Sequence, residues 1–470
     1  MKKSKIICTI GPASSDPIMI KNMILSGMNV ARLNLSHGTH ESHTDYINAI
    51  KVQREKLGVP VAIMLDLKGP EIRIKSFENG VVELKEGQIF TLTTGDIIGN
   101  ENIVSVTYKD LPKILSAGDR ILLNDGFSEL EVVSVNNYDV ITRVVEGGKL
   151  SNNKSINLPN ISVDMPYLSN VDKDDIKFGV EQDVDYIALS FVRTAEDVRD
   201  ARAYIKKLGG NGDKIKLISK IENQQGIDNI NAIIEESDGV MVARGDLGVE
   251  VDYKLVPIYQ KAIVDKCLKA GKIVIIATQM LESMVENSRP TRAELTDMAN
   301  AVLDGASALM LSGETANGKH VLKCIETMSD VIETCEKSFI VKTQSAEIDA
   351  DQEVSQSIAY ACKSLSYKVN TNAIIVVSLT GKSVLEVASF RPSCPIIACT
   401  TDLKVYNQLA LCWGAVPVLT KEYSSTDELL LASKECALKT GLVKKGDMVI
   451  QTAGIPLGQA PTNLLKIETL

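Results

Sequence analysis

The sequence predicts an α/β protein: a (β/α)8 TIM barrel with a small β-barrel inserted into it and a three-layer α/β unit after it. Eight short aliphatic runs alternate with helical patterns in residues 1–69 and 167–340, as expected for parallel strands buried on both faces. Residues 70–166 lack helical periodicity, and a second alternation occupies residues 341–470. At 470 residues the chain is also too long for one hydrophobic core.

The barrel strands are expected where the aliphatic runs fall. These runs are 5–10, 28–35, 61–66, 186–191, 215–221, 239–243, 272–278 and 307–312. The helices between them carry start signals, because Thr194 is followed by Asp197, and Thr291 by Glu294, at the spacing of a capping box. Eight strands that alternate with helices predict a closed (β/α)8 barrel.

The segment 70–166 is expected to be a β domain. GVVELKEG, IFTLTTG and RILLNDGFSELEVVSV have the pattern of short strands, and Asp125-Gly126 has that of a tight turn. Because this segment leaves the C-terminal end of the third barrel strand, it is expected to cover the barrel mouth as a lid.

The C-terminal unit is expected to alternate strands with helices. The strands are predicted at 373–379, 396–400, 415–420 and 447–452, and helices at 355–366 and 426–440. Strands that alternate with helices in this way predict a sheet with helices on both faces.

Composition argues against several classes of function. The net charge of −9 disfavours a nucleic-acid partner, and we find neither an apolar run of membrane-spanning length nor a secretory signal. The nine cysteines are an odd number without a CxxC pair, which indicates reduced thiols and a cytoplasmic protein. Arg244-Gly245-Asp246 matches the tripeptide of adhesion proteins, but such a role needs an extracellular protein.

Polar residues gather at the C-terminal ends of the predicted barrel strands, where the chemistry of such barrels is found. One polar residue at a strand end usually marks only where water begins, but seven consecutive strands end in this way. The residues, strand by strand, are Arg32, Asn34 and Ser36; Asp66; Ser190; Lys220 and Glu222; Arg244 and Asp246; Thr278; and Ser312 and Glu314.

These residue types suit one kind of chemistry. Glu222 and Asp246 are hard carboxylates of the kind that Mg²⁺ prefers. Lys220 places a cation where negative charge develops, and Arg32 grips a phosphate or carboxylate as a fork. Oxygens for a monovalent cation come from Asn34, Ser36 and Asp66, and groups for a proton relay from Thr278, Ser312 and Glu314. The set predicts metal-assisted phosphoryl transfer on a small anion.

Seven segments resemble the signature segments of the pyruvate kinase family, in that family's order. They are KIICTIGPAS (5–14), GMNVARLNLSHG (27–38), DLKGPEIR (66–73), SKIEN (219–223), MVARGDLGVE (241–250), ATQMLESM (277–284) and MLSGETANGK (310–319). The resemblance implies the glycolytic reaction of phosphoenolpyruvate with ADP to give pyruvate and ATP. It also implies a homotetramer, and a member without the additional C-terminal domain that some bacterial members carry.

The resemblance also implies a role for each matching residue. The catalytic residues would be Lys220, Arg32, Thr278, Ser312 and Glu314, and the substrate would contact Arg32, Lys220, Gly245, Asp246 and Thr278. Mg²⁺ or Mn²⁺ would bind Glu222 and Asp246, and K⁺ would bind Asn34, Ser36, Asp66 and the carbonyl of Leu67. The nucleotide would contact Asn34, His37, Arg73 and Lys154. Arg244 is expected to support Asp246 rather than to touch substrate.

The cation site departs from the family pattern. K⁺-dependent members usually have threonine where this chain has Leu67, and often again at Ile74. K⁺-independent members put a lysine where this chain has Glu71, whereas Glu71 and Lys68 take the K⁺-dependent form. Because a carboxylate at position 71 supplies no internal cation, we expect K⁺ dependence.

A loop in the C-terminal unit has the composition of a phosphate nest. The residues Ser378, Thr380, Gly381, Lys382 and Ser383 lie between a predicted strand and a helix, where hydroxyls and helix amides bind phosphate. The family binds phosphorylated effectors at this place, so an allosteric site is predicted here. The alternative is an ordinary strand-to-helix turn.

Other functions remain open on sequence alone. A metal-dependent lyase acting on pyruvate or phosphoenolpyruvate would use the same metal and carboxylates, but it would need neither ADP nor the insertion. An inactive homologue would be expected to have lost some of the strand-end residues. His37, His40 and His43 lack the spacing of a HExxH zinc site.

Overall fold

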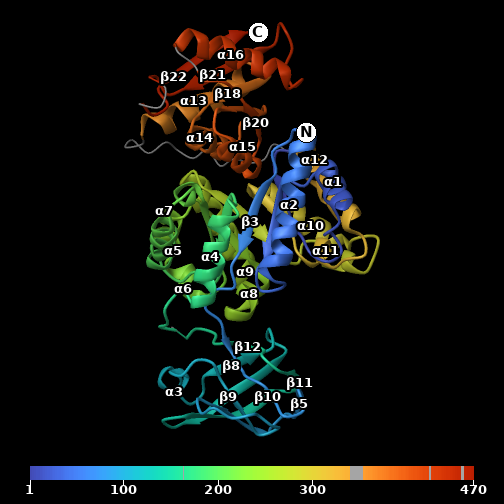
Figure 1. The fold of residues 1–470 in the computed structure, drawn as a ribbon, viewed down its shortest axis with the longest axis vertical. Coiled ribbons are helices and arrows are strands. Elements are labelled where there is room, and N and C mark those ends of the chain that lie inside the picture. Colours follow the sequence, from blue (N-terminus) through green and yellow to red (C-terminus); the bar gives the residue numbers. More distant parts are fainter. Residues whose placement is uncertain (162, 339–352, 423–424, 457–459) are drawn as a thin grey trace.

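The computed structural model describes residues 1–161, 163–338, 353–422, 425–456 and 460–470. Three units follow one another along the long axis of the molecule, with the barrel in the middle (Figure 1). We call the segment 70–166 the insert and the described residues from 353 onward the C-terminal unit. The insert and the C-terminal unit lie at opposite ends of the barrel (Figure 1).

The central unit is a closed barrel of eight parallel strands, which confirms the predicted fold. The strands are β1 (Lys5–Thr9), β2 (Val30–Asn34), β3 (Ala62–Asp66), β13 (Tyr186–Leu189), β14 (Lys216–Ile221), β15 (Gly239–Ala243), β16 (Ile273–Ala277) and β17 (Ala308–Leu311). The principal helices around it are α1 (Pro17–Ser26), α2 (His40–Leu57), α4 (Asn170–Glu181), α5 (Ala195–Leu208), α7 (Ile230–Glu236), α9 (Val256–Lys269), α10 (Arg292–Asp304) and α12 (Val321–Ser338).

Local chemistry starts these helices where the sequence predicts. Thr194 and Asp197 form a reciprocal capping box at α5, and Thr291 and Glu294 form another at α10. Each box satisfies backbone N–H groups that the first turn of a helix leaves without partners.

The insert leaves the barrel after β3 and contains a seven-stranded sheet in the order β4-β12-β8-β9-β10-β6-β7, with β11 and β5 paired beside it. Its strands are β4 (Ile72–Arg73), β5 (Val81–Leu84), β6 (Ile89–Thr93), β7 (Ile103–Ser105), β8 (Arg120–Leu123), β9 (Ser128–Val135), β10 (Asp139–Glu146), β11 (Gly148–Ser151) and β12 (Ser155–Asn157), and its helix is α3 (Leu111–Ile114). A bridge between Ile74 and Val106 joins the two edges of the large sheet. The sheet therefore curls round on itself, as a small β-barrel requires.

The C-terminal unit is a five-stranded sheet in the order β20-β19-β18-β21-β22. Its strands are β18 (Ala373–Val377), β19 (Ile396–Thr400), β20 (Ala415–Leu419), β21 (Met448–Ala453) and β22 (Leu464–Thr469). Helices α13 (Val354–Lys368) and α14 (Lys382–Ser389) pack into one apolar cluster on the sheet, and α16 (Thr426–Lys439) packs into a second. The three layers are confirmed, whereas the antiparallel strand β22 is not among the strands that the sequence predicts.

A short segment of the C-terminal unit closes the end of the barrel that lies opposite the insert. This segment comprises α15 (Leu403–Gln408) and the 3₁₀ turn η4 (Leu409–Leu411). Ala410 and Leu411 join the apolar cluster formed by the inward-facing residues of the barrel strands. Tyr186 donates its hydroxyl proton to the carbonyl oxygen of Gln408 at 2.7 Å. The C-terminal unit is thus part of the barrel's own core.

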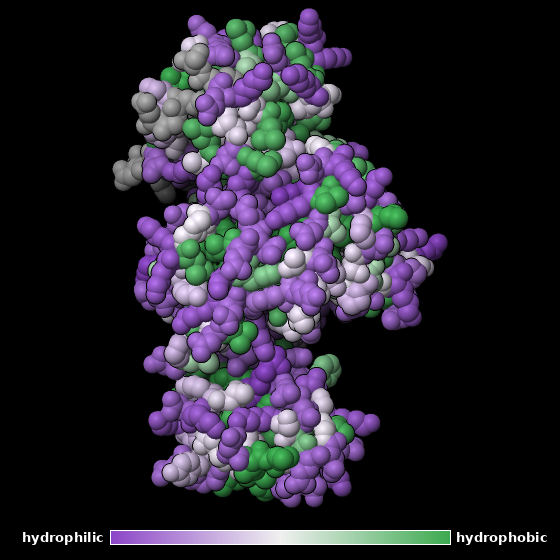
Figure 2. Space-filling view, in the orientation of Figure 1, coloured by the Kyte–Doolittle hydropathy of each residue, from purple (hydrophilic) through white to green (hydrophobic). Residues whose placement is uncertain are grey.

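The face shown in Figure 2 is mainly hydrophilic, with apolar side chains in small scattered groups. Among the described residues, no helix combines the length and the apolar character that a membrane span requires.

Candidate functional site

Four charged side chains meet at the mouth of the barrel, at the end that faces the insert. Arg32 donates from Nε to Oδ2 of Asp66 at 2.6 Å. The ammonium nitrogen of Lys220 lies 3.2 Å from Oδ1 of Asp66 and 2.9 Å from Oε1 of Glu222. All four side chains are buried. The spacing of two residues places Lys220 and Glu222 on one face at the end of β14, and closure of the barrel brings them to Arg32 and Asp66 at the ends of β2 and β3.

The electrostatics of this cluster keep Lys220 protonated. Burial alone lowers the pKa of Lys220, but the charges of Asp66, Glu222 and Asp246 outweigh it and hold that pKa above its usual range. Burial likewise works to raise the pKa of Asp66, and the cations Lys220 and Arg32 reverse the shift. For Glu222 burial prevails and raises the pKa to about 8. A bound cation beside Glu222 would therefore have to displace a proton near neutral pH.

The turn after β13 makes contacts that the sequence pattern does not predict. Lys220 donates from Nζ to the hydroxyl oxygen of Ser190 at 2.6 Å, and Ser190 donates to the carbonyl oxygen of Leu67 at 2.7 Å. The backbone N–H of Phe191 donates to Oε2 of Glu222 at 2.7 Å. Ser190 had been recognised only as a polar residue at a strand end. Its position beside Lys220 depends on strand order, which the sequence does not state.

The residues predicted for a monovalent cation lie on two adjacent strand ends. The strand register pairs Asn34 with Asp66, and the N–H of Leu35 donates to the carbonyl oxygen of Asp66 at 3.0 Å. Ser36 follows in the same turn, where its N–H donates to the side-chain oxygen of Asn34 at 3.2 Å. Together with the Leu67 carbonyl these groups supply only oxygen donors, which suits K⁺ chemically.

The Arg-Gly-Asp stretch follows β15 directly and is built into the mouth. Arg244 donates from Nη2 to the carbonyl oxygen of Thr278 at 2.7 Å and pairs through Nη1 with Asp297 at 2.7 Å. Its side chain is only 10% exposed, which is incompatible with display to a receptor. The N–H of Gly245 donates to the hydroxyl of Thr278 at 2.8 Å. The side chain of Asp246 instead borders the cleft described below.

Glu314 and Ser312 follow the last barrel strand. The fully buried carboxylate of Glu314 accepts the N–H groups of Ser312 at 2.7 Å and of Leu281 at 3.0 Å. Glu314 therefore fixes the turns after β16 and β17. The hydroxyl oxygen of Ser312 is buried, with no hydrogen-bond partner among the described residues. A buried hydroxyl in this state is one that a substrate or a water can satisfy.

A cleft with an empty volume of about 720 Å³ separates the mouth from the insert. Asp246, Glu250 and Asn223 border it from the barrel, and Glu71, Asp125 and Asn157 from the insert and its connections. Asn157 donates from Nδ2 to Oε1 of Glu250 at 2.7 Å across it. Charged groups at one wall and a separate domain at the other suit a reaction that must exclude water.

The residues predicted to contact a nucleotide are divided between the insert, where they adjoin residues that border the cleft, and the barrel. On the insert, the register pairs Arg73 with Ser155, the neighbour of Lys154. The guanidinium of Arg73 is held by Glu71 at 2.7 Å and by the carbonyl oxygen of Asn153 at 2.6 Å. His37 belongs to the barrel instead, in the turn after β2.

Further contacts lie beyond the sequence prediction. Thr9 accepts a hydrogen bond from Nη1 of Arg32 at 2.8 Å, and it ends the first barrel strand, so the strand-end rule could have found it. Arg193 donates to the carbonyl oxygens of Val163 and Met165, each at 2.8 Å, and so holds the segment that returns from the insert. No spacing in the sequence signals this long-range contact.

The predicted effector loop lies between β18 and α14. Gly381, at φ +81°, donates its N–H to the hydroxyl of Ser378 at 3.0 Å, and Lys382 donates its N–H to the hydroxyl of Thr380 at 3.4 Å. Ser383 accepts a hydrogen bond from Thr462 at 2.6 Å. The Lys382 side chain is 67% exposed. The N–H groups of Gly381 and Lys382 are thus paired within a compact turn, and the phosphate site stays a prediction.

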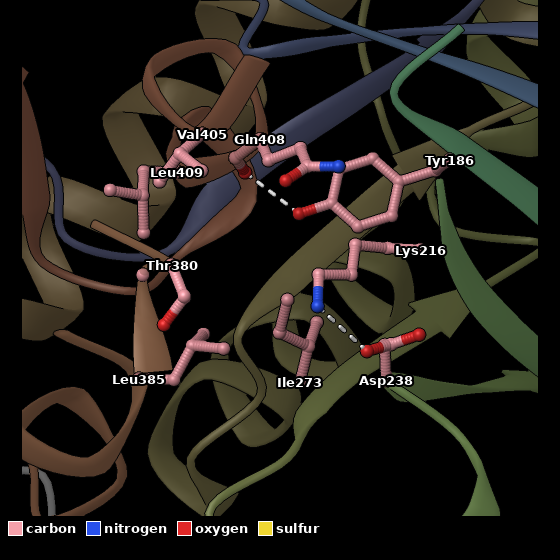
Figure 3. A pocket seen from close by; sticks show the side chains of 10 residues that line it. Tyr186, Lys216, Asp238, Ile273, Thr380, Leu385, Val405, Gln408 and Leu409 are labelled. Carbon is pink, nitrogen blue, oxygen red and sulfur yellow. Dashed lines mark hydrogen bonds and ion pairs between the residues drawn. The ribbon is translucent and has the colours of Figure 1, made fainter. Parts of the chain in front are cut away.

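The same loop also reaches the base of the barrel. Thr380 and Gly381 border a pocket with an empty volume of about 340 Å³, whose opposite wall includes Tyr186, Lys216 and Ile273 of the barrel strands (Figure 3). The loop therefore lies against the base of the barrel.

Metal ligands in this chain are few. Among the described residues, no group of three or more His, Cys, Asp or Glu side chains is arranged to hold a metal ion. Mg²⁺, however, binds proteins through one or two carboxylates plus substrate oxygens and water. Oε1 of Glu222 is buried and lies 2.9 Å from the ammonium nitrogen of Lys220. With the charge of Asp246 acting on the same carboxylate, the pair of carboxylates fits such an ion.

Comparisons with known proteins agree with this geometry. A model of "Pyruvate kinase, barrel domain" matches residues 1–325, and one of "Pyruvate kinase, alpha/beta domain" matches residues 356–468. The chain is 45% identical to a pyruvate kinase of Sporosarcina psychrophila, covering 100% of this chain and 81% of that protein. It is 42% identical to one of Clostridium acetobutylicum, covering 100% of both. A crystal structure of a pyruvate kinase from Cryptosporidium parvum superposes with a TM-score of 0.94 at 37% identity, covering 100% of this chain and 96% of the other.

Proposed function

Because this chain belongs to the pyruvate kinase family, a family of phosphotransferases, we propose that the barrel mouth transfers the phosphoryl group of phosphoenolpyruvate to ADP. We propose further that it works with Mg²⁺ and K⁺ and that the C-terminal unit controls it. The observation that carries the proposal is the buried cluster of Arg32, Asp66, Lys220 and Glu222.

This cluster suits phosphoryl transfer because that reaction needs positioned positive charge more than covalent chemistry. Lys220 keeps its proton among three carboxylates, so it can face the transferring group and the enolate oxygen as a cation. Arg32 is braced by Asp66 and Thr9 and can grip the phosphoryl group without reorganising. Glu222 and Asp246 would hold Mg²⁺, which would neutralise charge on the substrate oxygens.

Proton delivery to the enolate carbon is assigned to Thr278, Ser312 and Glu314. The hydroxyl of Thr278 accepts from Gly245 and donates to the Ala277 carbonyl oxygen at 2.6 Å, so its orientation is fixed. Glu314 holds the backbone on both sides of the relay. The hydroxyl of Ser312 has no hydrogen-bond partner in the described part of the chain, so it can pass a proton through an ordered water.

The remaining assignments extend the same proposal. Asn34, Ser36, Asp66 and the carbonyl of Leu67 would hold K⁺, and Asn34, His37, Arg73 and Lys154 would contact ADP while the insert acts as a lid. Ser378, Thr380, Gly381, Lys382 and Ser383 would bind the phosphate of an allosteric effector. A homotetramer is part of the proposal because the family resemblance implies it, and a cytoplasmic location because of the cysteine pattern.

The test is a coupled assay of pyruvate formation from phosphoenolpyruvate, with and without ADP, Mg²⁺ and K⁺. ADP-dependent turnover that needs both cations is the expected result. Pyruvate formed without ADP would replace the kinase with a lyase. No turnover by folded protein would mark an inactive homologue, and turnover without K⁺ would leave the kinase but remove the cation site.

A further inference from the structure

We propose that Ser190 is a positioning residue that couples the candidate K⁺ site and both connections of the insert to the ammonium group of Lys220. The proposal rests on the proposed function, because it concerns the lysine and the cation which that function uses. Neither the strand-end pattern nor the family matches assign this role.

The first step is the direction of the hydrogen bonds around the serine hydroxyl. Lys220 can only donate, so Ser190 accepts from it at 2.6 Å. The single hydroxyl proton then goes to the carbonyl oxygen of Leu67 at 2.7 Å, which is closer than Oδ1 of Asp66 at 3.3 Å. The ammonium, the hydroxyl and the carbonyl thus form one chain, and each hydrogen bond polarises the next. Ser190 is only 2% exposed, so this chain of hydrogen bonds is shielded from solvent.

The second step concerns the place where the insert leaves the barrel. Gly69 follows Leu67 by two residues and has φ +74°. A Cβ atom on Gly69 would lie 2.8 Å from Cβ and 2.8 Å from the carbonyl oxygen of Ser190. The backbone of this connection therefore rests directly on the serine. The N–H of Gly69 also donates to Asp172 at 2.9 Å, which fixes its distance from the barrel.

The third step concerns the place where the insert returns. Tyr167 is buried, and its hydroxyl donates to the carbonyl oxygen of Ser190 at 2.9 Å. Ser190 is thus in contact with both connections of the insert. Its side chain and backbone meet Gly69 where the insert leaves, and its carbonyl oxygen accepts from Tyr167 where the insert returns. Ser190 therefore links the two connections of the insert to the group that holds Lys220.

The local backbone is strained in a way that fits a functional position. Phe191 has φ +54°, an outlier for a bulky side chain. Such strain persists only where the surroundings impose it, and it gathers at active sites. Here the N–H of Phe191 is held by Glu222 at 2.7 Å. The turn therefore holds both Lys220, through the Ser190 hydroxyl, and Glu222, through the Phe191 N–H.

These contacts assign a physical route to cation activation. A K⁺ ion at the Leu67 carbonyl would fix that oxygen, and with it the hydroxyl of Ser190 and the direction of the Lys220 ammonium. Without the cation, Lys220 can turn fully toward Asp66 and Glu222, which already lie within ion-pair distance. Ser190 would thus convert cation binding into the orientation of the group that meets the phosphoryl.

The experiment compares Ser190→Ala and Ser190→Cys with the wild-type enzyme. Cysteine keeps the shape against Gly69 but is a weak donor and acceptor, so it separates hydrogen bonding from packing. Ser237→Ala is the matched control, because Ser237 is an equally buried serine whose hydroxyl pairs with Ser219 and not with the mouth. The first readout is the midpoint of thermal unfolding during a KCl titration at constant ionic strength, balanced with tetramethylammonium chloride. The second is kcat and the KM for phosphoenolpyruvate.

We expect both Ser190 variants to need at least about threefold more KCl for half of the thermal shift, and to lose about tenfold in kcat with little change in KM. Ser237→Ala should keep the wild-type KCl response. A wild-type KCl response in Ser190→Ala, or in Ser190→Cys alone, would overturn the proposal. If wild-type enzyme shows no K⁺-specific shift, the proposed cation site itself is wrong, and the coupling fails with it.

Discussion

Arg244 holds Thr278 by its backbone, through a 2.7 Å hydrogen bond from Nη2 to the carbonyl oxygen. Thr278 has φ +69°, a conformation that is strained for a β-branched residue. Asp297 fixes the other arm of the guanidinium at 2.7 Å. Thus the arginine of the Arg-Gly-Asp stretch stabilises strained Thr278, whose hydroxyl accepts the N–H of Gly245.

Replacing Arg244 by lysine is expected to lower kcat by about tenfold, because lysine cannot make both arms of the fork. Asp297→Asn should cost less, since the contact between Arg244 and Thr278 remains. Steady-state kinetics on both variants tests this order. A larger loss in Asp297→Asn than in Arg244→Lys would contradict it.

Replacing Lys220 by methionine is expected to reduce kcat by about three orders of magnitude, because a preorganised cation is lost at the transferring group. Lys216→Met is the matched control, since Lys216 lies on the same strand but pairs with Asp238 at the other end of the barrel (Figure 3). Circular dichroism would verify folding of both. A kcat within tenfold of wild type in Lys220→Met would remove the lysine from catalysis.

Turnover is expected to fall by at least about tenfold when K⁺ is replaced by tetramethylammonium at constant ionic strength, because the mouth then lacks one positive charge. Glu71 supplies none, as it is a carboxylate paired with Arg73 at 2.5 Å. Initial rates in the two salts measure the effect. Equal rates would show that Leu67 and its neighbours need no cation.

Glu250 gives a pH-dependent stability. Burial raises the pKa of Glu250 from 4.5 to about 7, so the folded protein binds a proton that the unfolded chain releases between these values. The free energy of unfolding therefore decreases as pH rises through this window. Glu250→Gln keeps the acceptor for Asn157 and should gain about 2 kcal/mol relative to wild type between pH 5 and pH 8. Urea unfolding at both pH values measures it, and a constant difference would refute the assignment.

Lys382→Glu is expected to raise the concentration of a phosphorylated effector needed for half of its response by at least about tenfold, because a carboxylate repels phosphate at the loop. The probes are ribose 5-phosphate, fructose 1,6-bisphosphate and AMP, read out as the shift in KM for phosphoenolpyruvate. Lys445→Glu, at an exposed lysine elsewhere in the same unit, should respond as wild type does. An unchanged response in Lys382→Glu would exclude this loop.

The barrel could be predicted because its signals are local. Aliphatic runs such as KIICT and AIMLD became β1 and β3, and the strand-end rule brought Arg32, Asp66 and Lys220 together. Each strand needs only its own pattern to be recognised, and barrel closure then aligns the ends.

Other parts of the molecule depend on contacts between distant residues, which periodicity does not report. The turn at Ser190 meets Leu67 and Lys220 only because the third and fifth strands flank the fourth. The strand β22 was missed because LLKIET is short and partly charged, and it pairs antiparallel at a sheet edge. Glu250 carries no sequence signal, since its burial comes from the insert.

The packing of Ala410 and Leu411 into the inner cluster of the barrel also bears on how the protein is made. During synthesis all eight barrel strands leave the ribosome before these two residues do. Until then, one end of the barrel interior remains open to water, and exposed apolar surface of this kind favours aggregation. The barrel therefore completes its core only after Ala410 and Leu411 have left the ribosome. A chain that stops before these residues is expected to be less stable and to aggregate more readily.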